Sequence, residues 1–125
     1  RGAYLCHVGN IETSATWEGF SGTFAEGMFG LRVSGTGLLF FGSYGDIQEV
    51  EVNGSYTVDN GYAVAWEQNL DYSIGRSGRS IRSFLFSDQL ICRFQGNGKL
   101  WVQTRSPRNL AAWVHPFRRV KSKND

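Results

Sequence analysis

Apolar residues along this chain occur in short runs that glycine pairs interrupt. Two such runs, Met28–Val33 and Leu38–Phe41, flank the segment Ser34-Gly35-Thr36-Gly37. Glycine adopts positive φ without steric cost, so a Gly-x-Gly segment between two β-prone runs is typical of a tight hairpin turn. The pattern predicts two strands joined by a turn at this point.

The same pattern returns in Ser87–Pro107. Gly35 and Gly37 align there with Gly96 and Gly98 at an offset of 61 residues, and the same offset relates Arg32 to Arg93. A second match, at an offset of 59 residues, precedes each copy. It relates Gly2, Ile11, Glu12 and Ser14 to Gly61, Leu70, Asp71 and Ser73. We therefore expect a single β domain over residues 1–117, built of two repeats at about 1–60 and 61–117, with a basic tail over residues 118–125.

Turn-forming residues also separate the other apolar runs, and helical periodicity is almost absent. Asn53-Gly54 and Gly9-Asn10 are typical of hairpin turns. Aromatic spacings of three and four in residues 15–33 would suit a helix, but glycines in that window, such as Gly19, Gly22 and Gly27, each cost a helix about 1 kcal/mol. An all-β fold is the prediction, with one short helix at most, at Asn109–Val114, capped by Ser106 or Asn109.

The composition supports a packed globule. Apolar residues make up 41% of the 125 residues and aromatic residues 14%, whereas charged residues are 19%, too few for a disordered chain. No apolar run approaches the ~20 residues that a membrane-spanning helix needs. Both cysteines, Cys6 and Cys92, lie in apolar runs, and we expect two buried reduced thiols. No H-x-H, H-E-x-x-H or C-x-x-C motif is present, so we expect no metal and no cofactor.

Charge divides the chain into unlike halves. Residues 1–60 contain two basic and seven acidic residues, a net charge of −5, and residues 61–125 contain eleven basic and four acidic residues, a net charge of +7. Opposite halves of this kind favour head-to-tail pairing with another subunit, or a basic face for an anionic partner. Both alternatives stay open at this point.

Three segments together resemble one known family. They are FGLRVSGTGLLFFGSYGDIQEVEV (29–52), YTVDNGYAVAWEQNLDYSI (56–74) and LICRFQGNGKLWVQTRSPRNLAAWVHPF (90–117). They resemble the altered inheritance of mitochondria protein 24 family, whose conserved domain has no known molecular function. The resemblance implies a fold similar to that of the trp RNA-binding attenuation protein, a short double-stranded β-helix repeated as a β-prism.

The resemblance also implies partners and a location. The family's prism has three units and is often trimeric, and the two units of this chain resemble the second and third. It implies a homo-oligomer, with a trimer favoured, or a first repeat supplied by a missing segment or another chain. It implies a cytoplasmic protein in a prokaryote and a mitochondrial one in a eukaryote. Membrane association of the family's mitochondrial members leaves a lipid contact open, without a transmembrane segment to support it.

Four charged residues form a candidate ligand site. Arg32 and Arg93 occupy equivalent places in the two repeats, and Glu26 and Glu67 lie beside apolar strands. A structural ion pair or a turn-capping role is the favoured interpretation, because an acid–base pair would need environments that separate the two pKa values. The alternative is a small-ligand or enzyme pocket between the repeats that contains all four.

The C-terminal half also has an aromatic and basic signature. Three tryptophans (Trp66, Trp101 and Trp113) accompany basic residues, a combination typical of single-strand nucleic-acid binding. The basic residues that would contact nucleic acid or another anion are Arg105, Arg108, Arg118, Arg119 and Lys121. We expect these tryptophans in the core instead, which counts against nucleic acid as a partner. The sequence thus favours a non-catalytic assembly or scaffold module over a ligand-binding, enzymatic or nucleic-acid-binding protein.

Overall fold

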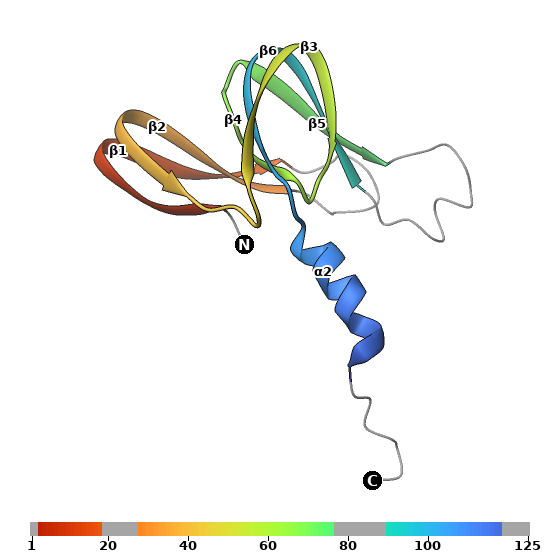
Figure 1. Cartoon of the computed structure of the whole chain (residues 1–125). Helices are drawn as coiled ribbons and strands as arrows, with labels where there is room; N and C mark the ends of the chain where they lie inside the picture. Colours follow the sequence, from red (N-terminus) through yellow and green to blue (C-terminus); the bar gives the residue numbers. More distant parts are fainter. Residues whose placement is uncertain (1–2, 19–27, 77–89, 119–125) are drawn as a thin grey trace.

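The computed structural model describes residues 3–18, 28–76 and 90–118, and most of these residues lie in β-strands (Figure 1). The predicted all-β fold with one short C-terminal helix is confirmed. The elements are β1 (Tyr4–Glu18), β2 (Met28–Phe41), β3 (Ile47–Asp59), β4 (Ala63–Trp66), β5 (Leu70–Arg76), β6 (Leu90–Gln103), α2 (Pro107–Val114) and the 3-10 turn η1 (His115–Phe117). The segment Ile81–Phe86, whose apolar residues also favour a strand, lies outside the described residues.

The strands form two antiparallel sheets. β1 and β2 make a two-stranded sheet, and β6 is the central strand of the other, with β3 on one edge and both β4 and β5 on the opposite edge. The chain passes from the first sheet to the second between Phe41 and Ile47. β3 therefore pairs with β6 in the second sheet, although it precedes the predicted repeat boundary near residue 60.

The predicted glycine turns are wrong, because the strands run through them. Gly35 and Gly37 lie inside β2, Gly96 and Gly98 inside β6, and Gly54 inside β3. Gly9, at the turn predicted for Gly9-Asn10, likewise lies inside β1. Most of these glycines adopt positive φ, as expected, but they bend long strands without reversing them.

Paired glycines explain where the strands bend. Gly9 is the partner of Gly37 in the first sheet, and Gly54 is the partner of Gly96 in the second. A Cβ atom at Gly37 would collide with the carbonyl oxygen of Val8, so the two backbones approach more closely than any side chain permits. Figure 1 shows the result, two long ribbons that each curl back on themselves.

The two sheets share a local register at the positions that the sequence aligns. In the first sheet Ile11 lies opposite Gly35 and Ser14 opposite Arg32. In the second sheet the aligned residues make the same pairs, with Leu70 opposite Gly96 and Ser73 opposite Arg93. The aligned residues therefore have equivalent partners, although the second sheet has two further strands.

The core of the described residues belongs to the second sheet. Alternate residues of β6 point into it, and the aromatic rings of Trp66 and Tyr72 lie 5.3 Å and 6.3 Å from the ring of Phe94. The buried apolar residues are Val52, Leu70, Cys92, Phe94, Leu100 and Val102. In the first sheet, no apolar side chain of residues 4–15 or 30–41 reaches this degree of burial. A two-stranded sheet of this kind has marginal stability alone.

Several predicted core residues are placed differently. Trp66 packs on the core as expected, and Trp101 is half-buried with its ring edge-on to Phe41, at 6.3 Å between centroids. Trp113, however, is 68% exposed, and the prediction that Cys6 is buried is wrong, because it lies on the open face of the two-stranded sheet. Both thiols are free, as expected.

The helix begins two residues earlier than predicted, at Pro107. Proline suits the first turn because its missing N–H would have no helical partner there. Ser106 is the N-cap residue, but its side chain makes no capping hydrogen bond. Asn109 does not cap the helix either, because its side-chain amide donates to the hydroxyl of Tyr62 at 2.7 Å.

Replacing Phe94 by alanine tests the core. Since the side chain of Phe94 is fully buried, we expect Phe94→Ala to lower the free energy of unfolding by about 3–5 kcal/mol, as measured by urea denaturation. Gln95→Ala, at the neighbouring exposed position of β6, is the control and should change it by less than about 0.5 kcal/mol. Equal effects of the two changes would contradict the assignment of this core.

Replacing Gly96 by alanine tests the glycine bend. Gly96 has a φ of +127°, and a Cβ atom there would lie 2.5 Å from the carbonyl oxygen of Asn69. We expect Gly96→Ala to cost more than about 1 kcal/mol of unfolding free energy. Gly75→Ala is the matched control, because no atom lies within 4 Å of its Cβ position, and it should leave the urea midpoint unchanged or raised. A Gly96→Ala protein as stable as the control would refute the bend.

Candidate functional site

An apolar patch on the two-stranded sheet is the first candidate. Val8 lies opposite Leu38 and Cys6 opposite Phe40, so the four side chains share one face of the sheet. Leu5, at the bulge next to them, lies 3.7 Å from the Cβ position of Gly42 on the same face. These five residues, Leu5, Cys6, Val8, Leu38 and Phe40, are the hairpin patch.

The hairpin patch is open to solvent. Leu5, Val8 and Leu38 are 67%, 61% and 64% exposed, and Phe40 is 47% exposed. Further along the same face the pairs become polar, with Asn10 opposite Thr36 and Glu12 opposite Ser34. A contiguous apolar surface with a polar margin is typical of a surface that another protein covers.

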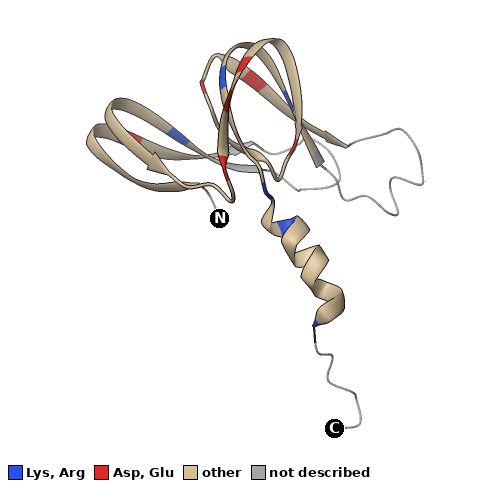
Figure 2. Cartoon of the chain, in the orientation of Figure 1, with Lys and Arg blue, Asp and Glu red and all other residues tan. Residues whose placement is uncertain are grey.

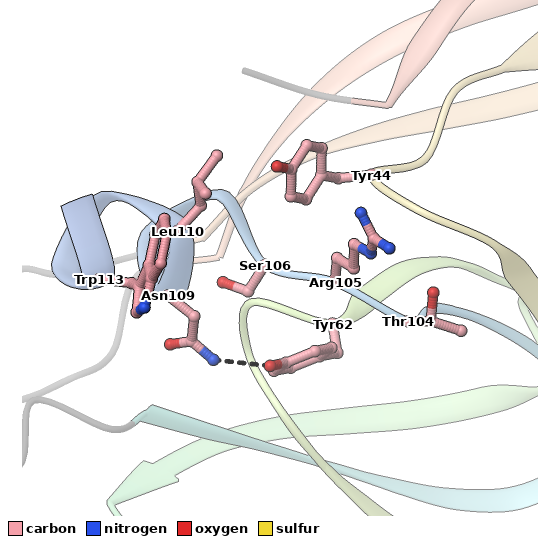
Figure 3. Close-up of a pocket in the computed structure, with 8 residues that line it drawn as sticks. All are labelled: Tyr44, Tyr62, Thr104, Arg105, Ser106, Asn109, Leu110 and Trp113. Carbon is pink, nitrogen blue, oxygen red and sulfur yellow. Dashed lines mark hydrogen bonds between the residues drawn. The ribbon is translucent and has the colours of Figure 1, made fainter.

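A groove at the base of α2 is the second candidate, with a volume of about 410 Å³ (Figure 3). Its position depends on the contacts of Gln103, whose side chain accepts the N–H of Tyr44 at 2.8 Å and donates to the carbonyl oxygen of Gly61 at 2.8 Å. These bonds fix two loops beside the end of β6. The lining residues are Tyr44, Tyr62, Thr104, Arg105, Ser106, Asn109, Leu110 and Trp113.

The chemistry of the groove is aromatic and cationic. Arg105 lies between the rings of Tyr44 and Tyr62, with the indole of Trp113 and the side chain of Leu110 on the helix side (Figure 3). A guanidinium among aromatic faces can bind a carboxylate or a phosphate and stack a planar group. The side chains that line the groove include four hydroxyl groups, those of Tyr44, Tyr62, Thr104 and Ser106, and no carboxylate, histidine or cysteine.

The structure separates the residues of the predicted ligand site. Arg32 is exposed on β2 in the first sheet, whereas Glu67 and Arg93 belong to the second. The carboxylate of Glu67 accepts the backbone N–H of Lys99 at 2.9 Å. Lys99 and Arg93 are six residues apart on β6, a separation of about 20 Å along the strand. Glu26 lies outside the described residues. Within the described ranges, neither arginine has an ion-pair partner, and these residues do not form one cluster.

Glu67 has a structural contact instead. Its carboxylate binds the backbone of β6 next to Gly98, and a Cβ atom at Gly98 would lie only 3.1 Å from Glu67 Oε2. Lys99 Nζ itself forms an ion pair with Glu49 Oε1 at 2.8 Å, and both side chains are a little under half exposed. The hydrogen bond from Lys99 to Glu49 raises the pKa of Lys99 above its usual value.

The predicted anion-binding residues are spread along the C-terminal region. Arg105 lines the groove, Arg108 is exposed in the first turn of α2, and Arg118 is exposed after η1. Arg119 and Lys121 lie outside the described residues. Figure 2 shows basic and acidic positions scattered over both sheets, with basic positions at both ends of the helix.

Sequence reasoning missed most of the groove. Tyr44 and Tyr62 lie far from Asn109 in the sequence, and no local pattern relates either tyrosine to it. The hydrogen bond between Tyr62 and Asn109 joins residues 47 positions apart. Aromatic residues next to turn glycines, as in Tyr44-Gly45 and Gly61-Tyr62, are the one local signal.

Comparison with known proteins identifies the family. The sequence profile of the family described as mitochondrial biogenesis AIM24 matches residues 1–105. The chain belongs to the AIM24 family. This confirms the resemblance to the altered inheritance of mitochondria protein 24 family.

Two relatives extend the comparison. An uncharacterized protein of Streptococcus pyogenes serotype M6 is 32% identical over 79 residues, which are 62% of this chain and 32% of that protein. A crystal structure of a Streptococcus pyogenes protein shares the fold, with a TM-score of 0.77 and 24% identity, over 93% of this chain and 52% of the solved chain. The AIM24 chain described here thus spans about a third of the curated relative and half of the solved one.

Among the described residues, no helix has the length and apolar character needed to cross a membrane. Their His, Cys, Asp and Glu side chains form no group of three or more that could hold a metal ion.

The two thiols differ in reactivity, which alkylation can test. Burial, assisted by the negative charge of Asp59, raises the pKa of Cys92 to about 11, and its thiol lies 3.4 Å from Asn60 Oδ1. Because the thiolate is the reactive form, iodoacetamide at pH 8 should label exposed Cys6 and leave Cys92 unmodified until urea is added. Peptide mass spectrometry identifies the labelled site. Equal labelling in the folded protein would show that Cys92 is accessible.

Proposed function

We propose that this AIM24 domain is a non-catalytic assembly module that acts by associating with further copies of itself. The observation that carries the proposal is the exposed hairpin patch on a sheet of only two strands. Such a sheet is marginal in water, and burying its apolar face against a partner would stabilise it. The functional unit proposed here is therefore an oligomer, with a trimer favoured.

The duplicated pattern supports the same proposal. The two sheets place aligned residues opposite equivalent partners, as expected for two repeats of one β-prism unit. In the second sheet β3 pairs with β6, and this sheet has a buried core. The first sheet has no covering strand among the described residues. A further copy of the chain, or a further repeat, would supply the missing cover.

The rival functions have less support. A small-ligand binder would use the groove at Arg105, which contains no catalytic pair. A nucleic-acid binder needs a continuous basic track with aromatic rings along it, whereas the basic and acidic positions of the described residues are mixed along both sheets (Figure 2). Of the predicted aromatic set, Trp66 packs on the core and only Trp113 is largely exposed.

Light scattering after size exclusion, at low and high salt, tests the proposal. We expect the wild-type protein to elute as a homo-oligomer and Leu38→Glu, which places a charge in the hairpin patch, to shift toward the monomer mass. The control is Thr57→Glu. Because the side chains of Leu38 and Thr57 are both exposed, both variants should keep the wild-type circular dichroism spectrum. The control should remain oligomeric. A monomeric wild type at both salt concentrations would overturn the proposal.

A further inference from the structure

The groove at the base of α2 contains an arginine without an acidic partner. Arg105 lines the groove, no carboxylate does so, and no Asp or Glu among the described residues forms an ion pair with Arg105. The guanidinium group of arginine stays charged at physiological pH. The positive charge of Arg105 is therefore available to an anion from outside the chain.

The turn at Gly45 sets the position of Arg105. Gly45 has a φ of +81°, and a Cβ atom there would lie 2.9 Å from Cγ of Arg105, so a side chain at position 45 would push Arg105 aside. The backbone N–H of Arg105 also donates to the carbonyl oxygen of Tyr44 at 3.1 Å. The stem of Arg105 is thus held against the loop that carries Tyr44 (Figure 3).

Aromatic rings and a buried hydroxyl surround this charge. Tyr44 and Tyr62 lie on either side of Arg105, and the indole of Trp113 lies on the helix side (Figure 3). Trp113 is 68% exposed, so most of its indole is open to a planar group that stacks on it. Ser106 is only 5% exposed and lines the groove, and its hydroxyl makes no capping hydrogen bond to α2. This hydroxyl can donate to an anion in the groove.

Hydrogen bonds hold the walls of the groove in place. The side chain of Gln103 accepts the N–H of Tyr44 and donates to the carbonyl oxygen of Gly61, each at 2.8 Å. The hydroxyl of Tyr62 accepts a hydrogen bond from the side-chain amide of Asn109 at 2.7 Å. These contacts attach two loops and the first turn of α2 to the end of β6. Binding a ligand therefore requires little further ordering of the chain, which lowers its entropic cost.

From these observations we propose that the groove binds a small anion that carries a planar ring, with a carboxylate or a phosphate as its charged group. Arg105 and Ser106 would bind the charged group, and the ring would stack on Trp113. The volume of about 410 Å³ is in the range of small-molecule sites. This site is separate from the hairpin patch, so the inference goes beyond the assembly function and does not depend on it.

The charge and the walls together favour this class of ligand. A cation would meet the positive charge of Arg105 with no carboxylate in the lining to offset it. A neutral ring would leave Arg105 without a partner, and an anion without a ring would leave the surfaces of Trp113 and Leu110 in water. A ligand that has both parts uses both features of the groove.

Ligand-observed NMR titration of the purified protein tests the inference with matched probes. Benzoate has the ring and the charge, benzamide has the ring alone, and acetate has the charge alone. We expect benzoate to bind with a dissociation constant on the order of 1 mM, and the other two probes to bind at least about fivefold more weakly. Phenyl phosphate distinguishes the two anionic groups, because tighter binding than benzoate assigns a phosphate and weaker binding assigns a carboxylate.

Substitutions locate the site. We expect Arg105→Gln, which removes the charge and keeps a long polar side chain, to weaken the binding of benzoate at least about tenfold. Arg93→Gln is the matched control, because Arg93 is exposed near the opposite end of β6, and it should leave the affinity unchanged. Trp113→Ala should weaken binding about fivefold through the loss of stacking. All three positions are exposed, so each variant should keep the wild-type circular dichroism spectrum.

Three results would overturn the inference. Equal affinities for benzoate and benzamide would mean that the charge of the ligand plays no part. Equal losses of affinity in Arg105→Gln and Arg93→Gln would mean a diffuse attraction to the basic half of the chain. Absence of binding by both benzoate and phenyl phosphate in the millimolar range would exclude the site. A monomeric wild type by light scattering would overturn the assembly function alone, so the two proposals fail independently.

Discussion

The close approach of backbones at glycine is the constraint on which this structure depends. At Gly35, Gly37 and Gly96 a Cβ atom would collide with a carbonyl oxygen of the neighbouring strand or loop, and all three have positive φ. Strands of 13 to 15 residues would otherwise form long twisted ribbons without an interior. The glycine bends let each ribbon curl, and the curl brings distant parts of the same strand pair toward one another.

The glycine bends have different consequences in the two sheets, because among the described residues only the second sheet encloses a buried apolar core. In the second sheet β4 and β5 pair with successive parts of β6, and Phe94 and Leu100 are buried beneath them. The first sheet has the same bend without further described strands, and several of its apolar side chains, such as Leu5, Val8 and Leu38, are exposed. This asymmetry is the physical reason to expect association, since apolar burial contributes about 25 cal/mol per Å².

The helix base links fold and function. Gln103 binds the loops at Tyr44 and Gly61 beside the end of β6, and Tyr62 accepts a hydrogen bond from Asn109 of α2. From this base α2 extends away from both sheets (Figure 1). The groove lies at this base, because Tyr62, Arg105 and Asn109 line it.

The sequence by itself determined the family, the all-β class, the short helix and the alignment of Gly35 with Gly96, because these depend on local residue types and their spacing. It did not determine that the glycines bend strands instead of ending them, since positive φ serves both purposes and only the partner strand decides. It also misplaced Cys6 and Trp113, because an apolar run shows that a side chain needs cover but not whether its own chain supplies it. The groove depended on tertiary structure entirely. Tyr62 and Asn109 meet through the path of β6, and no local pattern records a contact across 47 residues.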